Sequence, residues 1–199
     1  MSYEALKSVL SKGPSRAALY SVRIPKFGIS ENNHMNFLCD AVSVPGIRFN
    51  TSIALGQEFM GTQRDMPTAL VYAKPLTMSV IESRDYIIYK ALKRWHNDIC
   101  RNANQPGITG GNGRSHRMNY YNNYITDLEI VKFEYANRSK ILSGSMSLPD
   151  DCYDEVMRFT FINAWPTEIG PLQYSSMPDA PPVSFDIQFT YESYNVSQV

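Results

Sequence analysis

Val183-Ser-Phe-Asp-Ile-Gln-Phe-Thr-Tyr191, near the end of the chain, is the stretch that decides the fold class. Apolar and polar residues alternate along it without interruption. Because successive side chains of a strand point to opposite faces of a sheet, this alternation predicts a β-strand with one buried and one solvated face. Half-solvated strands are typical of antiparallel sheets, so the stretch favours an antiparallel β fold.

Other segments extend this prediction to about seven strands, separated by Gly and Pro residues that punctuate the chain. A looser alternation of apolar and polar residues occurs in the segments 17–24, 35–44, 47–67, 76–81, 125–135 and 156–164. The chain is therefore predicted to be mainly β, of the α+β class, with one helix flanking an antiparallel sandwich or partial barrel.

The flanking helix is predicted at residues 84–101, with Ser83 as its N-cap. An apolar stripe repeats at helical spacing and should face the sheet; it consists of Ile88, Leu92, Trp95 and Ile99. A cationic stripe on another side should lie outside the sheet, facing either solvent or a sheath-like partner; it consists of Lys90, Arg94 and Arg101. Residues 1–13 are predicted to form a short N-terminal helix, and the Gly-rich segment 102–124 a flexible loop.

The segment 47–67 is predicted to be an extended hairpin arm, set off by Pro45-Gly46 and Pro67. Its apolar residues are too many for a solvated loop and too irregular for a central strand; they are Ile47, Phe49, Ile53, Leu55, Phe59 and Met60. An isolated two-stranded hairpin is marginally stable in water. We therefore expect the arm to pack on a neighbouring subunit.

Length and charge exclude several classes of protein. The 199 residues form one domain, 1–199, and the 19 basic and 19 acidic residues cancel. A chain without net positive charge does not suit binding that neutralises phosphates. No apolar run approaches the length of a membrane span, so no membrane anchor is expected. The three cysteines are widely spaced, which predicts neither a disulfide framework nor a metal site.

Residues that could carry catalysis are few. His96 and Cys100 have helical spacing, but no third group orients them and no oxyanion hole accompanies them. The acidic residues at 150–155 lack the spacing of a calcium loop, and the Gly-rich 110–113 stretch lacks the lysine of a phosphate-binding loop. The sequence therefore predicts no enzyme, no cofactor and no metal.

The C-terminal fifty residues resemble the signature of tail tube proteins of contractile-tailed bacteriophages. In that family a strand ends in a Trp-Pro pair, a short Gly-containing connection follows, and a terminal strand alternates. Here Trp165-Pro166 ends the strand from Arg158, Gly170 lies in the connection, and the terminal strand carries Phe185, Ile187 and Phe189. The order of the preceding elements is similar too, so the resemblance covers nearly the whole chain.

The resemblance implies a structural virion protein. Such subunits form hexameric rings that stack into a tail tube, with a continuous inner β-barrel completed across subunits, through which double-stranded DNA passes to the host. The implied partners are further copies of the chain, a tail sheath protein, and baseplate and tail-terminator proteins. The implied location is the virion, after assembly in the host cytoplasm.

Two alternatives stay open at this point. One has the same fold: a baseplate tube-initiator, or the tube subunit of a phage-like contractile injection or secretion machine. The other belongs to another class: a monomeric cytosolic β-barrel that binds a small apolar ligand in its cavity. Electron microscopy of the purified protein distinguishes the two classes, because only the first forms rings or tubes.

Overall fold

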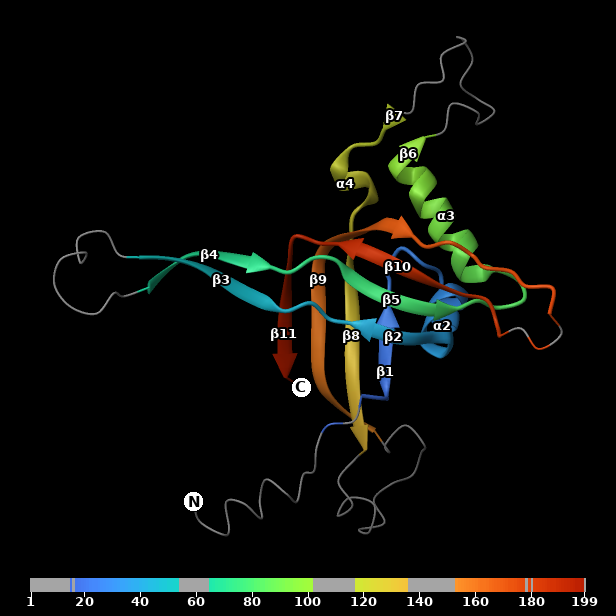
Figure 1. Ribbon diagram of the computed structural model, residues 1–199, viewed down its shortest axis with the longest axis horizontal. Coiled ribbons are helices and arrows are strands. Elements are labelled where there is room, and N and C mark those ends of the chain that lie inside the picture. Colours follow the sequence, from blue (N-terminus) through green and yellow to red (C-terminus); the bar gives the residue numbers. More distant parts are fainter. Residues whose placement is uncertain are drawn as a thin grey trace.

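The computed structural model describes residues 15, 17–53, 65–101, 117–135, 153–177, 179 and 181–198 (Figure 1). The strands are β1 (Tyr20–Arg23), β2 (Cys39–Ser43), β3 (Ile47–Ile53), β4 (Asp65–Tyr72), β5 (Leu76–Ile81), β6 (Cys100–Arg101), β7 (Arg117–Met118), β8 (Thr126–Tyr135), β9 (Tyr153–Ile169), β10 (Ser184–Thr190) and β11 (Ser193–Gln198). The helices are α2 (Ile29–Leu38), α3 (Ile87–Ile99) and α4 (Tyr121–Tyr124). The predicted helix at 1–13 and the arm residues Leu55, Phe59 and Met60 lie outside the described residues.

Two antiparallel layers cross and share one strand. The first, sheet A, has the order β1-β8-β9-β11, and the second, sheet B, has the order β9-β10-β5-β2. Strand β9 is 17 residues long and passes from one layer to the other. It turns near Asn163, which has a positive φ of 55°. Figure 1 shows the strands of the two layers running nearly at right angles, as in orthogonally packed β-sandwiches.

The core lies where the two layers cross. Sheet B contributes the alternating residues that the C-terminal pattern predicts, Phe185, Ile187 and Phe189, all of which are buried. Sheet A contributes Leu128, Ile130 and Phe161, and α3 contributes its predicted apolar stripe. The fold is mainly β and antiparallel with a flanking helix, as the sequence predicts.

Helix α3 is shorter than predicted at both ends. It begins at Ile87, not at residue 84, because Tyr86 takes a left-handed conformation as the N-cap. The carboxylate of buried Glu82, and not Ser83, satisfies the helix N-terminus: its Oε2 accepts a 2.8 Å hydrogen bond from the Tyr89 amide. At the other end the chain leaves the helix as β6.

Residues 29–38 form helix α2, although the sequence predicts a strand over 35–44. The strand starts only at Cys39. Four of the ten α2 residues are apolar, but only Met35 is buried, and Ile29 and Phe37 are exposed, so the sequence has no buried apolar stripe to indicate a helix. Two asparagine side chains instead fix the helix to strand β1, a contact that no local pattern reveals.

Part of the predicted loop at 102–124 is regular structure. Residues 117–118 form β7, which pairs with β6, and residues 121–124 form α4. The Trp95 indole N–H donates a 2.7 Å hydrogen bond to the backbone carbonyl oxygen of Tyr124, at the end of α4. This bond and the β6–β7 pairing return the chain to the body of the domain before strand β8 begins.

Candidate assembly surfaces

The β3–β4 arm is the distal part of one long hairpin whose proximal part is β2 and β5. The two arm strands pair with each other and with no other described strand, and they reach away from the body of the domain (Figure 1). Ile47 lies opposite Tyr72, and Phe49 lies opposite Leu70, so these residues share one face. Ile47, Phe49 and Leu70 are 49%, 62% and 47% exposed. The arm therefore presents an apolar face that no described part of the chain covers.

Two tyrosines anchor the arm where its two strands join the body of the domain. The Tyr191 hydroxyl donates to the carbonyl oxygen of Ala73, just after β4, and the Tyr194 hydroxyl donates to that of Pro45, just before β3. The Tyr72 ring packs edge-on against both tyrosine rings, at centroid distances of 6.5 and 5.4 Å. We call these three residues the tyrosine clamp. Sequence patterns did not identify it, because its parts are more than a hundred residues apart.

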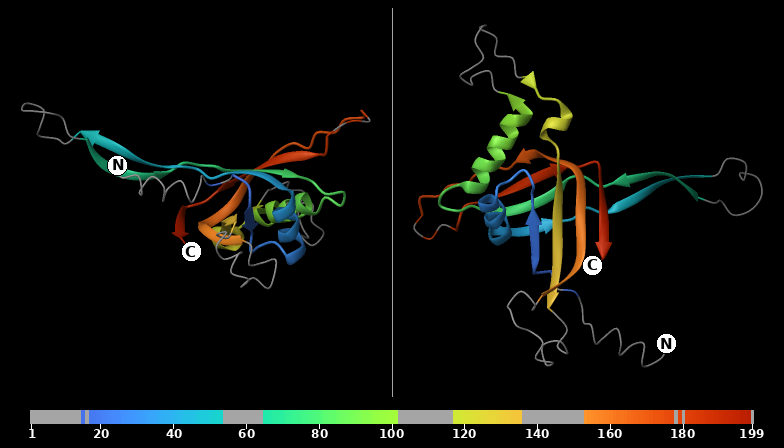
Figure 2. Two further views of the ribbon diagram at one scale, coloured as in Figure 1. Left: turned by 90° about the horizontal axis from the view of Figure 1, so that it is seen from below. Right: turned by 180° about the vertical axis from the view of Figure 1, so that it is seen from behind.

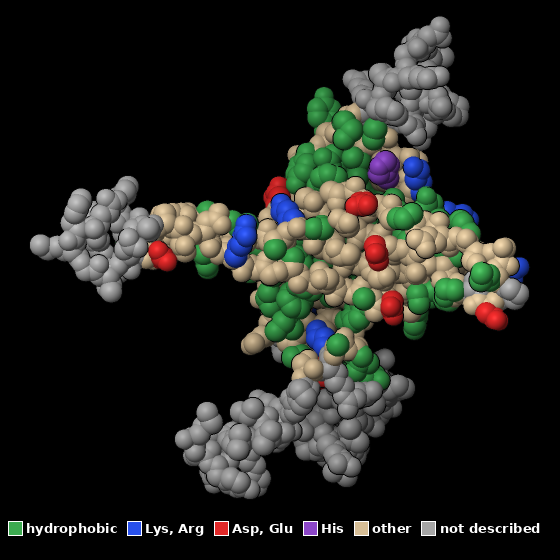
Figure 3. Space-filling view, in the orientation of Figure 1, with side chains coloured by type: hydrophobic (Ala, Val, Ile, Leu, Met, Phe, Trp, Pro, Cys, Tyr) green, Lys and Arg blue, Asp and Glu red, His purple; other side chains and the backbone are tan. Residues whose placement is uncertain are grey.

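Apart from the β9–β10 connection, no described element covers one face of sheet B, which we call its uncovered face, since α2, α3 and sheet A all lie on the other side (Figure 2). Its side chains alternate with the buried ones and are mostly small and polar: Ser43, Thr77, Ser79, Glu168, Ser184, Asp186 and Gln188. The segments of β2, β5, β9 and β10 that build sheet B contain no Lys or Arg. Figure 3 views this face and shows acidic side chains across its middle, with basic ones toward the arm.

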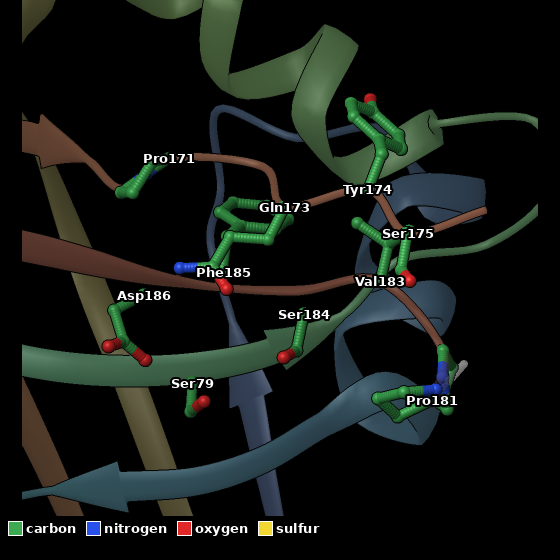
Figure 4. Close-up of a pocket in the computed structure, with 11 residues that line it drawn as sticks. Ser79, Pro171, Gln173, Tyr174, Ser175, Pro181, Val183, Ser184, Phe185 and Asp186 are labelled. Carbon is green, nitrogen blue, oxygen red and sulfur yellow. The ribbon is translucent and has the colours of Figure 1, made fainter. Parts of the chain in front are cut away.

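A hollow of about 620 Å³ opens on the same face, where the connection between β9 and β10 stands over the sheet (Figure 4). Ser79, Ser184 and Asp186 form its floor, and Tyr174 and Pro181 lie on the connection. The lining contains one carboxylate and neither His, Cys nor Lys. Such a set does not form a nucleophile and base pair, so the hollow has no evident catalytic chemistry.

The outer edge of sheet A is sealed at strand β1. The Asn36 side-chain oxygen accepts a 2.8 Å hydrogen bond from the Val22 amide. Asn32 accepts a bond of the same length from the Ile24 amide and donates one of 3.1 Å to the Ile24 carbonyl oxygen. Three backbone groups that another strand would need, the amides of Val22 and Ile24 and the Ile24 carbonyl oxygen, are thus occupied by helix α2.

Within the seven-stranded sheet, three other strand edges have no described strand paired with them: that of β11, that of β2, and that of β9 from Pro166 to Ile169. Strand β11 carries neither charge nor Pro, the usual devices that keep an edge from pairing. Pro166 lies where β9 becomes the edge of sheet B, a position that needs no backbone donor. The Trp165 ring is half-buried beside it, edge-on to Tyr124.

The cationic stripe of α3 is partly engaged within the chain. Arg94 forms a 2.9 Å ion pair with Glu31 of α2, and Lys90 donates to the Asp85 carbonyl oxygen. Lys93, which the sequence analysis did not single out, is exposed on the same side of the helix. The side chain of Arg101 lies outside the described part of the chain.

Other classes of site are missing from the described residues. There, no three His, Cys, Asp or Glu side chains gather as they would around a metal ion. None of the described helices is both long and apolar enough to cross a membrane. Burial raises the pKa of the Cys39 thiol to about 11, the opposite of what a nucleophile requires.

Comparison with known proteins gives the family. The family of phage tail tube proteins matches the sequence over residues 12–197. No curated protein sequence matches.

Among solved structures, a chain of the anti-feeding prophage baseplate superposes with a TM-score of 0.55 at 7% identity, covering 93% of this chain and 96% of the other. A chain of the anti-feeding prophage tube-terminating cap gives 0.55 at 12% identity, covering 94% and 92%. A chain of the sheath–tube complex of the extracellular contractile injection system PVC gives 0.50 at 12% identity, covering 100% and 99%.

These identities are low, so the superpositions show a shared fold alone. The family match, by contrast, spans almost the whole sequence, and it agrees with a mainly β domain that has open strand edges. The chain belongs to the phage tail tube protein family, and it is a structural protein rather than an enzyme.

Proposed function

We propose that this chain is the repeating subunit of a hexameric, stacked-ring tail tube through which phage DNA passes to the host. The observation that carries the proposal is the pair of open edges on sheet B, at β2 and at β9. A head-to-tail contact between two different edges of one sheet repeats from copy to copy and closes into a ring. Closure into a barrel removes both edges.

Sheet A is less suited to this role. Its β1 edge is sealed by Asn32 and Asn36, so it can accept a neighbouring strand only at β11. A sheet with one open edge can form a pair but cannot propagate around a ring. We therefore assign the inner barrel to sheet B, and its uncovered face to the bore.

The chemistry of that face supports the passage of DNA. Asp186 and Glu168 are its charged groups among the residues named above, and the strands of sheet B supply no cation. Because DNA binding rests largely on Lys and Arg contacts to phosphate, a wall of Ser, Thr, Gln and carboxylates gives the DNA nothing to bind. A neutral to acidic bore lets a polyanion slide.

The outer wall then consists of the helices, since α3 packs on the opposite side of sheet B. We assign its cationic side, with Lys90 and Arg94, to a sheath protein that surrounds the tube. Baseplate and tail-terminator proteins are assigned to the two ends of the stack. The solved structures that share this fold come from a sheath–tube complex, a baseplate and a cap of contractile injection systems.

Electron microscopy of the purified full chain tests the proposal. We expect six-fold rings that stack into tubes; rings that do not stack would instead indicate a tube-initiator. Rings with five or seven subunits, or particles that stay monomeric at every concentration and in the presence of a tail baseplate, would overturn it.

The bore assignment has its own test. Asp186→Lys with Glu168→Lys should leave tube assembly intact and make the tubes retain linear DNA at low salt. The matched control makes the same change of charge at two exposed residues in and just before helix α3, Asp85→Lys with Asp98→Lys. If the control tubes retain DNA equally and the variant at Asp186 and Glu168 adds nothing, the uncovered face of sheet B does not line the bore.

A further inference from the structure

An apolar groove runs between the edge of sheet B and the half of sheet A that sheet B does not cross. Figure 1 shows sheet A continuing well past the crossing strands. The groove has a volume of about 570 Å³. Its apolar lining includes Val42 and Val44 on one side and Ile130, Met157 and Phe159 on the other.

The floor of the groove belongs to a row of side chains that becomes steadily more exposed. Val22 lies opposite Ile130, Ile130 opposite Phe159, and Phe159 opposite Val196, so the four share one face of sheet A. Val22 and Ile130 are buried, Phe159 is half-buried, and Val196 at the open β11 edge is 48% exposed. The apolar surface therefore continues from the core to an edge that nothing described covers.

We propose that this groove receives the apolar face of the β3–β4 arm of a second copy of the chain. The proposal rests on the proposed function, and it adds the surface to which the arm binds. The arm offers Ile47, Phe49 and Leu70, which are as exposed as Val196 and equally uncovered. Two uncovered apolar surfaces on one soluble chain indicate an interface.

The arm of the same chain cannot fill the groove. The tyrosine clamp anchors both strands of the arm at its base, through hydrogen bonds to Pro45 and Ala73. The amide of Ala73 also donates a 3.0 Å hydrogen bond to the Gly46 carbonyl oxygen, which joins the two strands there. The arm consequently points away from the body (Figures 1 and 2). Folding it back would break these bonds and the ring contacts of Tyr72.

The groove lies where an arm-in-groove contact could repeat from one copy to the next. Val44 lines the groove and also lies in the short link from β2 to β3, so the groove opens beside the root of the chain's own arm. A copy whose groove is filled therefore extends its own arm from the same place toward the next copy. This is a heterologous contact, the type that builds rings and stacks.

Photo-crosslinking in the assembled protein tests the contact. A benzoylphenylalanine replaces Phe49, and assembly from a mixture of light and heavy-isotope chains marks crosslinks between copies. We expect crosslinks between copies to residues 40–44, 157–159 and 196, with Met157 favoured by the chemistry of the probe. Crosslinks to another surface of the second copy, or within one chain alone, would overturn the proposal.

A charge placed at the rim gives a second, independent measurement. Val196→Glu should raise the protein concentration needed for ring formation about tenfold or more, since a charge would be buried against the arm. Asn195→Glu is the matched control, because its side chain points to the opposite face of the same strand. Equal effects of the two variants would contradict the proposal.

The two hypotheses fail separately. If the unmodified protein forms no rings or stacks, the proposed function fails. Suppose instead that it forms them normally, but the Phe49 probe does not crosslink to the groove residues and Val196→Glu does not raise the concentration needed for ring formation. Only the groove assignment then fails. If hydroxyl-radical footprinting finds the side chains of Val196 and Met157 already shielded from solvent in the dispersed monomer, the chain itself covers the groove and the assignment is wrong.

Discussion

The phenol of Tyr194 donates a 3.0 Å hydrogen bond to the carbonyl oxygen of Pro45, a residue 149 positions earlier in the chain. This bond joins the last strand of the fold, β11, to the residue just before the first strand of the arm, β3. Together with the Tyr191 bond to Ala73, it sets the direction of the arm before any second copy arrives. A preorganised arm loses less conformational entropy on binding than a mobile one.

Removing the Tyr194 hydroxyl should loosen the arm at its root. Tyr194→Phe is expected to cost about 0.5–1.5 kcal/mol of folding stability, the net value of one hydrogen bond. Amide exchange across β3 and β4 should accelerate, which mass spectrometry can follow. Tyr20→Phe is the control, since it removes a similar bond, to the Cys39 carbonyl oxygen, away from the arm. Equal acceleration in both variants would show that the clamp does not direct the arm.

Alkaline pH should destabilise the fold through Tyr191. Burial, with Tyr194 and Tyr72 nearby, raises the pKa of Tyr191 to about 12, against about 10 in an unfolded chain. Between these values the unfolded chain releases a proton that the folded chain keeps, so stability is full below pH ~10 and falls as the pH rises toward 12. Urea denaturation at a series of pH values should show this fall, and Tyr191→Phe should reduce its slope. An unchanged slope in the variant would contradict the assignment.

The two tryptophans should differ in their effect on stability. Trp95 is 1% exposed and packs against Phe27 and Phe189, so Trp95→Ala should cost about 3–5 kcal/mol. Trp165 is half-buried and packs mainly on Tyr124, so Trp165→Ala should cost about 1–3 kcal/mol. Chemical denaturation of both variants gives the comparison. A larger loss for Trp165 would mean that it holds more of the core than its burial indicates.

Glu82 should control the start of helix α3. Its carboxylate accepts hydrogen bonds from the amides of Ser83 and Tyr89, at 2.9 and 2.8 Å. Glu82→Ala leaves the Tyr89 amide without this partner and should cost about 1–3 kcal/mol, with fraying of the first helical turn. Circular dichroism and amide exchange at residues 87–90 measure both effects. Asp85→Ala, exposed in the preceding turn, is the control and should have little effect.

Reversing the charges of α3 should weaken sheath assembly and leave the tube intact. Lys90→Glu with Arg94→Glu removes two cations from the outer wall, but it also breaks the ion pair with Glu31. An exposed pair of this kind contributes at most about 1 kcal/mol. Adding Glu31→Arg restores the pair with inverted signs and separates the two causes. Normal sheath assembly on the first double variant would mean that this side of the helix is merely solvated.

Local periodicity explains which elements the sequence could predict. Strand β10 and helix α3 bury regular stripes, so their residues reveal both the element and its buried face. Helix α2 could not be predicted in this way, because Asn32 and Asn36 hold it to β1 and its apolar residues form no buried stripe. The apolar residues of the arm could be read from the sequence, whereas the clamp could not, because Tyr191 and Tyr194 come near the arm only when the sheets cross.

Strand β9 has a mechanical consequence for a tube wall. It belongs to both layers, and it passes between them at Asn163, where one residue with a φ of 55° turns the strand. The two layers are therefore joined by peptide bonds as well as by packed side chains. Load applied along the tube axis to one layer reaches the other through a continuous covalent chain, so the layers cannot slide past each other without unfolding β9. A wall built from such units resists shear and buckling.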